Sequence, residues 1–82
     1  MRVKLHPRVI KFLDKLEPKI SVRIKEKIKL LKDNPHRYLT PLRGTNALKL
    51  RIGEYRAFVD VDSQREIVFV RDVRHRRNAY KN

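Results

Sequence analysis

The sequence predicts an α+β fold in which an N-terminal helical hairpin packs on one face of an antiparallel sheet, with the elements in the order β-α-α-β-β-β. Three observations support this class. Apolar residues recur at helical spacing up to residue 32, the hydrophobic period changes to two from residue 47, and turn-forming residues separate the later segments. The 82 residues suffice for one modest core, so residues 1–82 are expected to form a single domain.

The first part of the chain is predicted to form a strand and two helices. Residues 2–5 alternate apolar and basic side chains, which indicates a short edge strand. Pro7 suits the first turn of a helix, where no N–H donor is needed, and Pro18 marks the start of a second helix after a tight break. The apolar stripes of the two helices are expected to be Val9, Ile10, Leu13 and Leu16, and then Ile20, Ile24, Ile28 and Leu31.

The second helix is expected to end at Asp33-Asn34-Pro35, and residues 33–46 are predicted to be a loop. Residues 47–52 then alternate as a strand does, because successive side chains point to opposite faces. One face of this strand is expected to carry Leu48, Leu50 and Ile52, and the other Lys49 and Arg51.

Two further strands follow. Gly53-Glu54 predicts a turn into a strand whose apolar face is Tyr55, Ala57, Val59 and Val61, with Arg56, Phe58 and Asp60 opposite. Residues 62–64 predict a second turn. Residues 67–70 are apolar at every position, which indicates a central strand, and the strand pattern is expected to end after Val73.

The charge balance points to a polyanionic partner. Lysine and arginine number 22 against 9 acidic residues, a formal net charge of +13. Such an excess attracts nucleic acid, because neutralising phosphates releases counterions. The alternative is a lysine-rich solvated surface of the kind found in proteins from hot environments. Glutamate does not rise with lysine here, which weakens that alternative.

Several classes of site are disfavoured. The chain has no cysteine, its three histidines are scattered, and its acidic residues offer no paired-carboxylate site, so we expect neither a metal nor a cofactor. No apolar run approaches the roughly 20 residues that span a bilayer, and residues 1–5 lack the apolar core of a signal peptide. A cytoplasmic protein without membrane contact is expected.

Basic side chains are predicted to converge on the face of the sheet that the helices leave open. Lys49, Arg51 and Arg56 fall on that face by the alternation of their strands. The chain then leaves its last strand through Arg74, His75, Arg76, Arg77 and Tyr80, which could close one edge of the face. Cations beside an aromatic ring that stacks on a base indicate a single-stranded RNA site. Alternating lysine and arginine are also the ordinary wet side of an antiparallel sheet, which leaves that alternative open for Lys49 or Arg51 taken singly.

Other polar and aromatic residues have simpler interpretations. The cations of helix 18–32 are expected to be a solvated face that contributes long-range attraction. His6 and His36 are expected at the surface or as loop anchors, Tyr38 as packing for the loop, and Tyr55 in the core.

The chain also carries a series of motifs along its C-terminal half. They are Asn34-Pro35, Pro41-Leu42-Arg43-Gly44, Lys49-Leu50-Arg51-Ile52-Gly53-Glu54-Tyr55-Arg56 and Val73-Arg74-His75-Arg76-Arg77-Asn78-Ala79-Tyr80. In this order they resemble the RelE/ParE toxin superfamily of type II toxin–antitoxin systems, and its RelE-type members in particular. The preceding helical hairpin agrees with the family in order and length.

The resemblance implies a RelE-like fold and a ribosome-dependent mRNA endoribonuclease. RelE-type toxins enter the ribosomal A site and cleave the bound messenger by attack of its own 2′-hydroxyl, without a metal. Carried over residue by residue, the catalytic positions are Lys49, Arg56, Arg76 and Tyr80. Ala47 stands where a second basic strand residue can occur, and Arg51 is expected to supply part of that charge.

The chemistry requires a base for the 2′-hydroxyl, cations around the phosphorane and an acid for the leaving 5′-oxygen. Tyr80 is the first candidate base because nearby cations favour its phenolate, and Lys49 is the alternative. Arg56 and Arg51 would clamp the phosphate, and Arg76 or His75 would act as the acid. Further RNA contacts are expected from Arg51, Arg74, His75, Arg77 and Arg43.

The resemblance also implies partners and rivals. The expected partners are a RelB-like antitoxin, the ribosome and mRNA. One rival function is a ParE-like toxin that poisons DNA gyrase, although members of that branch tend to lack the basic and tyrosine set. The other rival is an RNA-binding module without catalysis, for which salt-dependent binding without cyclic phosphate ends would be the signature.

Overall fold

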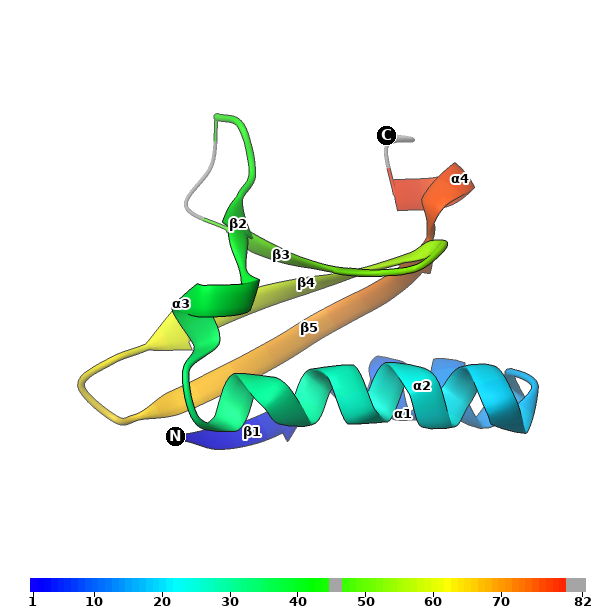
Figure 1. Cartoon of the computed structure of the whole chain (residues 1–82), viewed down its shortest axis with the longest axis horizontal. Helices are drawn as coiled ribbons and strands as arrows, with labels where there is room; N and C mark the ends of the chain where they lie inside the picture. Colours follow the sequence, from blue (N-terminus) through cyan, green and yellow to red (C-terminus); the bar gives the residue numbers. More distant parts are fainter. Residues whose placement is uncertain (45–46, 80–82) are drawn as a thin grey trace.

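A five-stranded sheet covered on one face by a helical hairpin makes up the computed structural model, which describes residues 1–44 and 47–79. The strand order is β1-β5-β4-β3-β2, and Figure 1 shows α1 and α2 on one side of the sheet and α4 on the other. The elements are β1 (Arg2–Leu5), α1 (Pro7–Lys15), α2 (Pro18–Lys29), the 3-10 helix η1 (Leu30–Lys32), α3 (Pro35–Tyr38), β2 (Thr40–Pro41), β3 (Leu48–Ile52), β4 (Tyr55–Asp62), β5 (Ile67–His75) and α4 (Arg76–Ala79). The predicted α+β class is confirmed.

The helical hairpin forms for the reasons that its sequence indicates. Pro7 and Pro18 occupy first-turn positions of α1 and α2, and His6 caps α1 because its Nδ1 accepts the Arg8 backbone N–H at 3.1 Å. The predicted place of Ile10 in the apolar stripe of α1 is wrong. Ile10 is 48% exposed because it lies one helical step round from buried Val9, and Phe12 packs against the core instead.

The predicted loop of residues 33–46 is wrong for two of its segments. Pro35 begins the one-turn helix α3, and Thr40–Pro41 forms β2, which pairs antiparallel with β3. Elements of four and two residues are too short to show a hydrophobic period, and β2 exists only through its pairing with Lys49 and Leu48.

The sheet is antiparallel from β2 to β5, as predicted, but β1 pairs with β5 in parallel. The local alternation of β1 cannot indicate this pairing, because β5 lies more than sixty positions away along the chain. The strand expected to end after Val73 continues to His75, because Arg74 and His75 pair with Arg56 and Tyr55 of β4. Between Val70 and Asp72 the register shifts, so Arg71 lies at a β-bulge.

The core lies between the sheet and the hairpin. Its members are apolar side chains from both layers: Val9, Leu13, Ile24, Ile28, Leu31, Leu39, Leu50, Ile52, Ala57, Val59, Val68, Val70 and Val73. Alternation along β3, β4 and β5 therefore turns the intervening side chains to the opposite face of the sheet. We call this second surface the open face.

Candidate nucleic-acid interface

Three arginines lie in a row across the open face. Arg51 of β3 pairs directly with Arg56 of β4, which pairs with Arg74 of β5. Directly opposed residues of neighbouring strands share a face, with Cβ atoms about 5 Å apart. We call these three residues the arginine row. Because opposed like charges destabilise a sheet, three guanidinium groups in line favour a bound anion.

The middle arginine of the row is held in place by the backbone. Arg56 is only 6% exposed, and its Nη1 donates to the carbonyl oxygens of Gly53 at 3.3 Å and Tyr55 at 3.1 Å. Arg56 forms no salt bridge within the described ranges 1–44 and 47–79. Among these described contacts the guanidinium donates to neutral carbonyls and has no carboxylate partner, an arrangement that favours binding of an anion.

Arg74 is oriented by a carboxylate on its own strand. Its Nε donates to Asp72 Oδ2 at 2.8 Å, and the other carboxylate oxygen accepts the Val73 N–H at 3.0 Å. Asp72 belongs to a second row with Phe58, Lys49 and Thr40. Lys49, half-buried in that row, therefore lies one pleat from Arg51 and on the same face.

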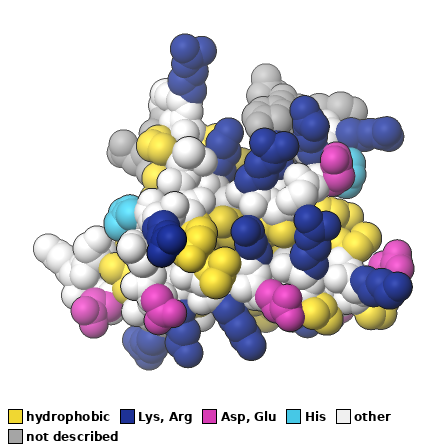
Figure 2. All heavy atoms as spheres, in the orientation of Figure 1, with side chains coloured by type: hydrophobic (Ala, Val, Ile, Leu, Met, Phe, Trp, Pro, Cys, Tyr) yellow, Lys and Arg dark blue, Asp and Glu magenta, His cyan; other side chains and the backbone are white. Residues whose placement is uncertain are grey.

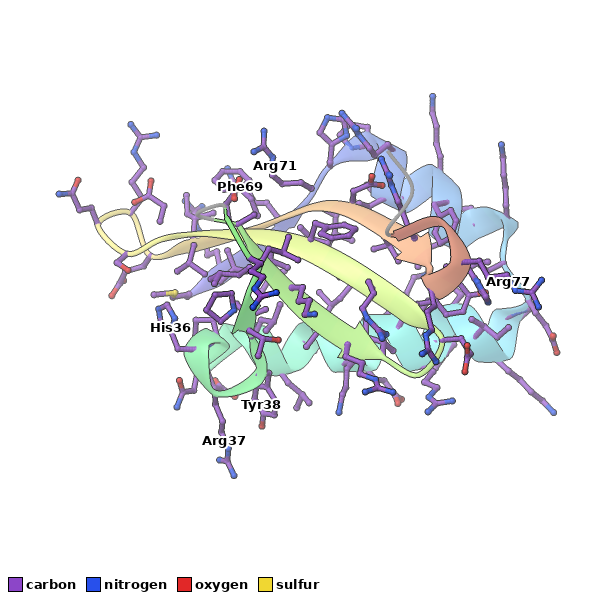
Figure 3. The ribbon with its side chains drawn as sticks, turned by 90° about the horizontal axis from the view of Figure 1, so that it is seen from above. His36, Arg37, Tyr38, Phe69, Arg71 and Arg77 are labelled. Carbon is purple, nitrogen blue, oxygen red and sulfur yellow. The ribbon has the colours of Figure 1, made fainter. Side chains whose placement is uncertain are left out.

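The last helix lies at the same end of the sheet as the arginine row. The Arg76 N–H donates to the Glu54 carbonyl at 2.6 Å, which fixes the start of α4 beside the β3–β4 turn. The side chains of Arg76 and Arg77 are exposed. Figure 3 shows Arg77 at α4, at the edge of the molecule when viewed onto the open face. The structure thus brings Arg76 to the end of the sheet that carries Arg51, Arg56 and Arg74.

His75 takes a different position from the one expected. It pairs with Tyr55, and its ring meets the Tyr55 ring edge-on at 5.2 Å, while Tyr55 contacts Phe12 at 6.1 Å. Its Nδ1 accepts the Arg77 N–H at 3.2 Å, which stabilises the first turn of α4. By strand alternation His75 lies on the side opposite the arginine row, so its role as an acid stays a prediction that this geometry does not favour.

Arg43 lies outside the three strands that carry the arginine row. It is exposed and follows β2, next to Gly44, whose positive φ of 76° suits glycine. Residues 42–44, which follow β2, and helix α4 both lie on the open side of the sheet, at separate places along it (Figure 1). Tyr80, the first candidate base, lies outside the described residues.

Comparison with known proteins assigns the family. The model of the family described as ParE toxin of type II toxin-antitoxin system, parDE, matches residues 3–80. The chain belongs to the RelE/ParE toxin family. A protein of Methanocaldococcus jannaschii provisionally named toxin RelE1 is 34% identical to this RelE/ParE chain, over 98% of the chain and 94% of the relative.

Solved RelE structures share the fold of this RelE/ParE toxin. The RelBE2 toxin–antitoxin complex of Mycobacterium tuberculosis contains a chain with a TM-score of 0.82 and 28% identity, covering 92% of this chain and 96% of that one. A chain of the RelE-RelB complex of Pyrococcus horikoshii has a TM-score of 0.80 and 26% identity, covering 95% and 97%. These neighbours carry RelE names although the family model is described as ParE.

The charge of this RelE/ParE toxin is not confined to the open face. Figure 2 shows lysine and arginine side chains around α4 and β2, and also along the lower side formed by the helices. The helix cations include Lys25, Lys29 and Lys32, which surround a pocket of about 330 Å³ floored by Val3, Leu5 and Ile28. Cations therefore lie on both sides of the molecule, and within the arginine row Arg56 is set apart by its burial and its hydrogen bonds.

Sequence reasoning missed the acidic partner of the arginine row and the place of Phe69 on the open face. Asp72 precedes Arg74 by two positions, so strand alternation could have placed the two side chains together. Phe58 was expected on the face of Arg56 and lies there, whereas Phe69 was treated only as part of a central strand and lies on the open face opposite Asp60. The sequence does not show which residue of the neighbouring strand lies opposite each of these positions, and that pairing places them on the open face.

Two absences concern the described part of this RelE/ParE toxin. In residues 1–44 and 47–79, no group of three His, Cys, Asp or Glu side chains is arranged to hold a metal ion. None of the helices in these same ranges is long and apolar enough to cross a membrane.

Proposed function

We propose that this RelE/ParE toxin is a ribosome-dependent mRNA endoribonuclease that cuts the messenger in the A site without a metal ion. The observation that carries the proposal is the arginine row, in which a buried Arg56 lies between Arg51 and Arg74. A phosphorane carries more negative charge than the phosphodiester from which it forms. Preorganised donors that meet this charge stabilise the transition state more than the ground state.

In the proposed reaction the 2′-hydroxyl oxygen attacks the adjacent phosphorus, and the bond from phosphorus to the 5′-oxygen breaks. The products are a 2′,3′-cyclic phosphate and a 5′-hydroxyl end. Lys49 or Tyr80 takes the 2′-hydroxyl proton, Arg56 and Arg51 hold the phosphorane, and an acid on α4 donates a proton to the leaving 5′-oxygen. Arg76 suits that last role better than His75, whose Nδ1 is occupied and whose ring packs on Tyr55.

An antitoxin is the proposed protein partner. Similar chains were solved in RelE-RelB and RelBE2 complexes, and a net charge of +13 favours a partner with acidic segments. We propose a RelB-like antitoxin that restrains this toxin, with the ribosome and mRNA as its targets.

The test is cleavage of mRNA on programmed ribosomes. The purified chain is added to ribosomes with an empty A site, and primer extension locates the cut while end analysis identifies the 2′,3′-cyclic phosphate. Cleavage that persists in EDTA-treated protein and needs the ribosome supports the proposal. Strong RNA binding without cleavage would instead identify a binding module.

A second candidate follows from the family model, whose description names ParE. A gyrase-poisoning toxin would inhibit supercoiling by purified DNA gyrase and leave ribosome-bound mRNA intact. Running the supercoiling and cleavage assays on the same preparation separates the two branches.

A further inference from the structure

A second basic and aromatic site lies on the open face, beyond the β-bulge from the arginine row. Phe69 of β5 pairs with Asp60 of β4 on one side and with Lys4 of β1 on the other, so the three side chains share the open face. Phe69 is 40% exposed, the third most exposed of the large apolar side chains among the described residues. The Phe69 ring is therefore accessible to a ligand between two charged neighbours.

The β-bulge supplies a cation to this site. Arg71 has no directly opposed residue on β4, and its Nη1 donates to Asp60 Oδ2 at 2.9 Å. Since Asp60 pairs with Phe69, this ion pair holds the Arg71 guanidinium on the open face. Figure 3 shows Phe69 and Arg71 close together along β5. Both residues line one surface pocket.

The pocket has a volume of about 430 Å³, and Lys4, His6, Phe69, Arg71 and Asp60 are among its lining residues. Lys4 and Arg71 outnumber the one carboxylate. One of the lining residues, His6, also contacts a further cation, because its Nδ1 accepts the Arg8 Nε–H at 3.2 Å. A ring face, surrounding cations and a carboxylate that can accept from a base amino group are the elements that bind an unpaired nucleotide.

We propose that this pocket is a binding subsite for one unpaired base of single-stranded RNA. Phe69 stacks on the base, while Lys4 and Arg71 hold the flanking phosphates. Phe69 and Arg74 are five positions apart on β5, a separation of about 16 Å. At a stacked spacing of about 3.4 Å per nucleotide, roughly five nucleotides connect the subsite to the arginine row. Its assignment to the messenger that is cut rests on the proposed function, whereas its affinity for RNA does not.

Binding of a 5′-labelled oligoadenylate, followed by fluorescence anisotropy without ribosomes, tests the subsite. Phe69→Ala should weaken binding about five- to tenfold, and Phe69→Tyr should restore it, because stacking needs only the ring. The slope of log affinity against log salt should stay at the wild-type value, since no charge is removed. Val22→Ala, which shortens another exposed apolar side chain (52% exposed, on α2), is the matched control and should bind as wild type.

An abasic oligomer of equal length isolates the stacking contribution. Phe69→Ala should bind the abasic oligomer as tightly as wild type does. Arg71→Gln should weaken binding to both oligomers and lower the slope of log affinity against log salt. Arg65→Gln is the charge control, because Arg65 is also an exposed arginine paired with an aspartate, Asp62, but lies at the β4–β5 turn. Its effect on oligoadenylate should be smaller than that of Arg71→Gln.

Wild-type affinity for oligoadenylate in a folded Phe69→Ala variant would overturn the proposal, as would equal losses for the oligoadenylate and abasic strands. If that variant instead lost affinity for a co-expressed antitoxin alone, the pocket would be a protein contact. Failure of the ribosome assay leaves these outcomes unaffected, so the subsite and the nuclease function fail separately.

Discussion

The two ends of the open face hold their cations in different ways. In the arginine row, Arg56 is 6% exposed and bonded to two backbone carbonyls, so its position is fixed before any ligand arrives. At the Phe69 pocket, the Arg71 side chain is 68% exposed and its ion pair with Asp60 lies in solvent. A buried donor suits a reaction that needs fixed geometry, whereas an exposed cation beside a ring suits adaptable binding.

The comparison predicts the largest loss of cleavage for Arg56. We expect Arg56→Ala to reduce the single-turnover rate on programmed ribosomes about a hundredfold or more, because it removes a preorganised donor from the phosphorane. Arg56→Lys keeps the charge but not the planar guanidinium group, so its cleavage rate should lie between those of the wild type and Arg56→Ala. Thermal unfolding of both variants controls for lost folding, since Arg56→Ala also leaves two carbonyls without their donor. A rate near wild type in folded Arg56→Ala would contradict the proposed role.

The predicted acid and base on the C-terminal segment should have the next largest effect. We expect Arg76→Ala and Tyr80→Phe each to reduce cleavage at least about tenfold, the lower range for loss of a proton-transfer group. Arg76→Ala should not unfold the protein, because Arg76 is exposed and its N–H contact with Glu54 involves only the backbone. Arg65→Ala is the charge-matched control. Normal cleavage by both variants would refute these assignments.

Substitution of the aspartate at each end of the open face, Asp72 at the arginine row and Asp60 at the Phe69 pocket, should change cleavage least. Asp72→Asn frees Arg74 from its 2.8 Å contact, so we expect cleavage to fall a few-fold while RNA binding at low salt does not weaken. Asp60→Asn should change the cleavage rate by less than about twofold and the free energy of unfolding by less than about 1 kcal/mol, because its ion pair is solvent-exposed. Comparing the two variants in one cleavage assay and one urea titration checks the ranking. Equal effects on the rate would remove the proposed difference between the two ends.

Local patterns in the sequence determined much of the fold. Helical spacing and two first-turn prolines specified the hairpin, and alternation with turn residues specified β3 and β4, because both signals depend only on neighbours along the chain. The same alternation correctly put Lys49, Arg51 and Arg56 on one face. It could not reveal the parallel pairing of β1 with β5, the short elements α3 and β2, or the extension of β5 to His75, since each depends on a partner distant in sequence.

Tertiary structure alone decided how the site is built. Burial of Arg56, the pairing of His75 with Tyr55 and the contact of α4 with Glu54 all arise where strand ends meet, so each depends on a partner elsewhere in the chain. The Phe69 pocket likewise combines residues from β1, β4 and β5 around a bulge. Composition determined the formal net charge of +13, because charge sums along the chain whatever its fold. Which cations act together was decided by cross-strand register, which only the folded sheet provides.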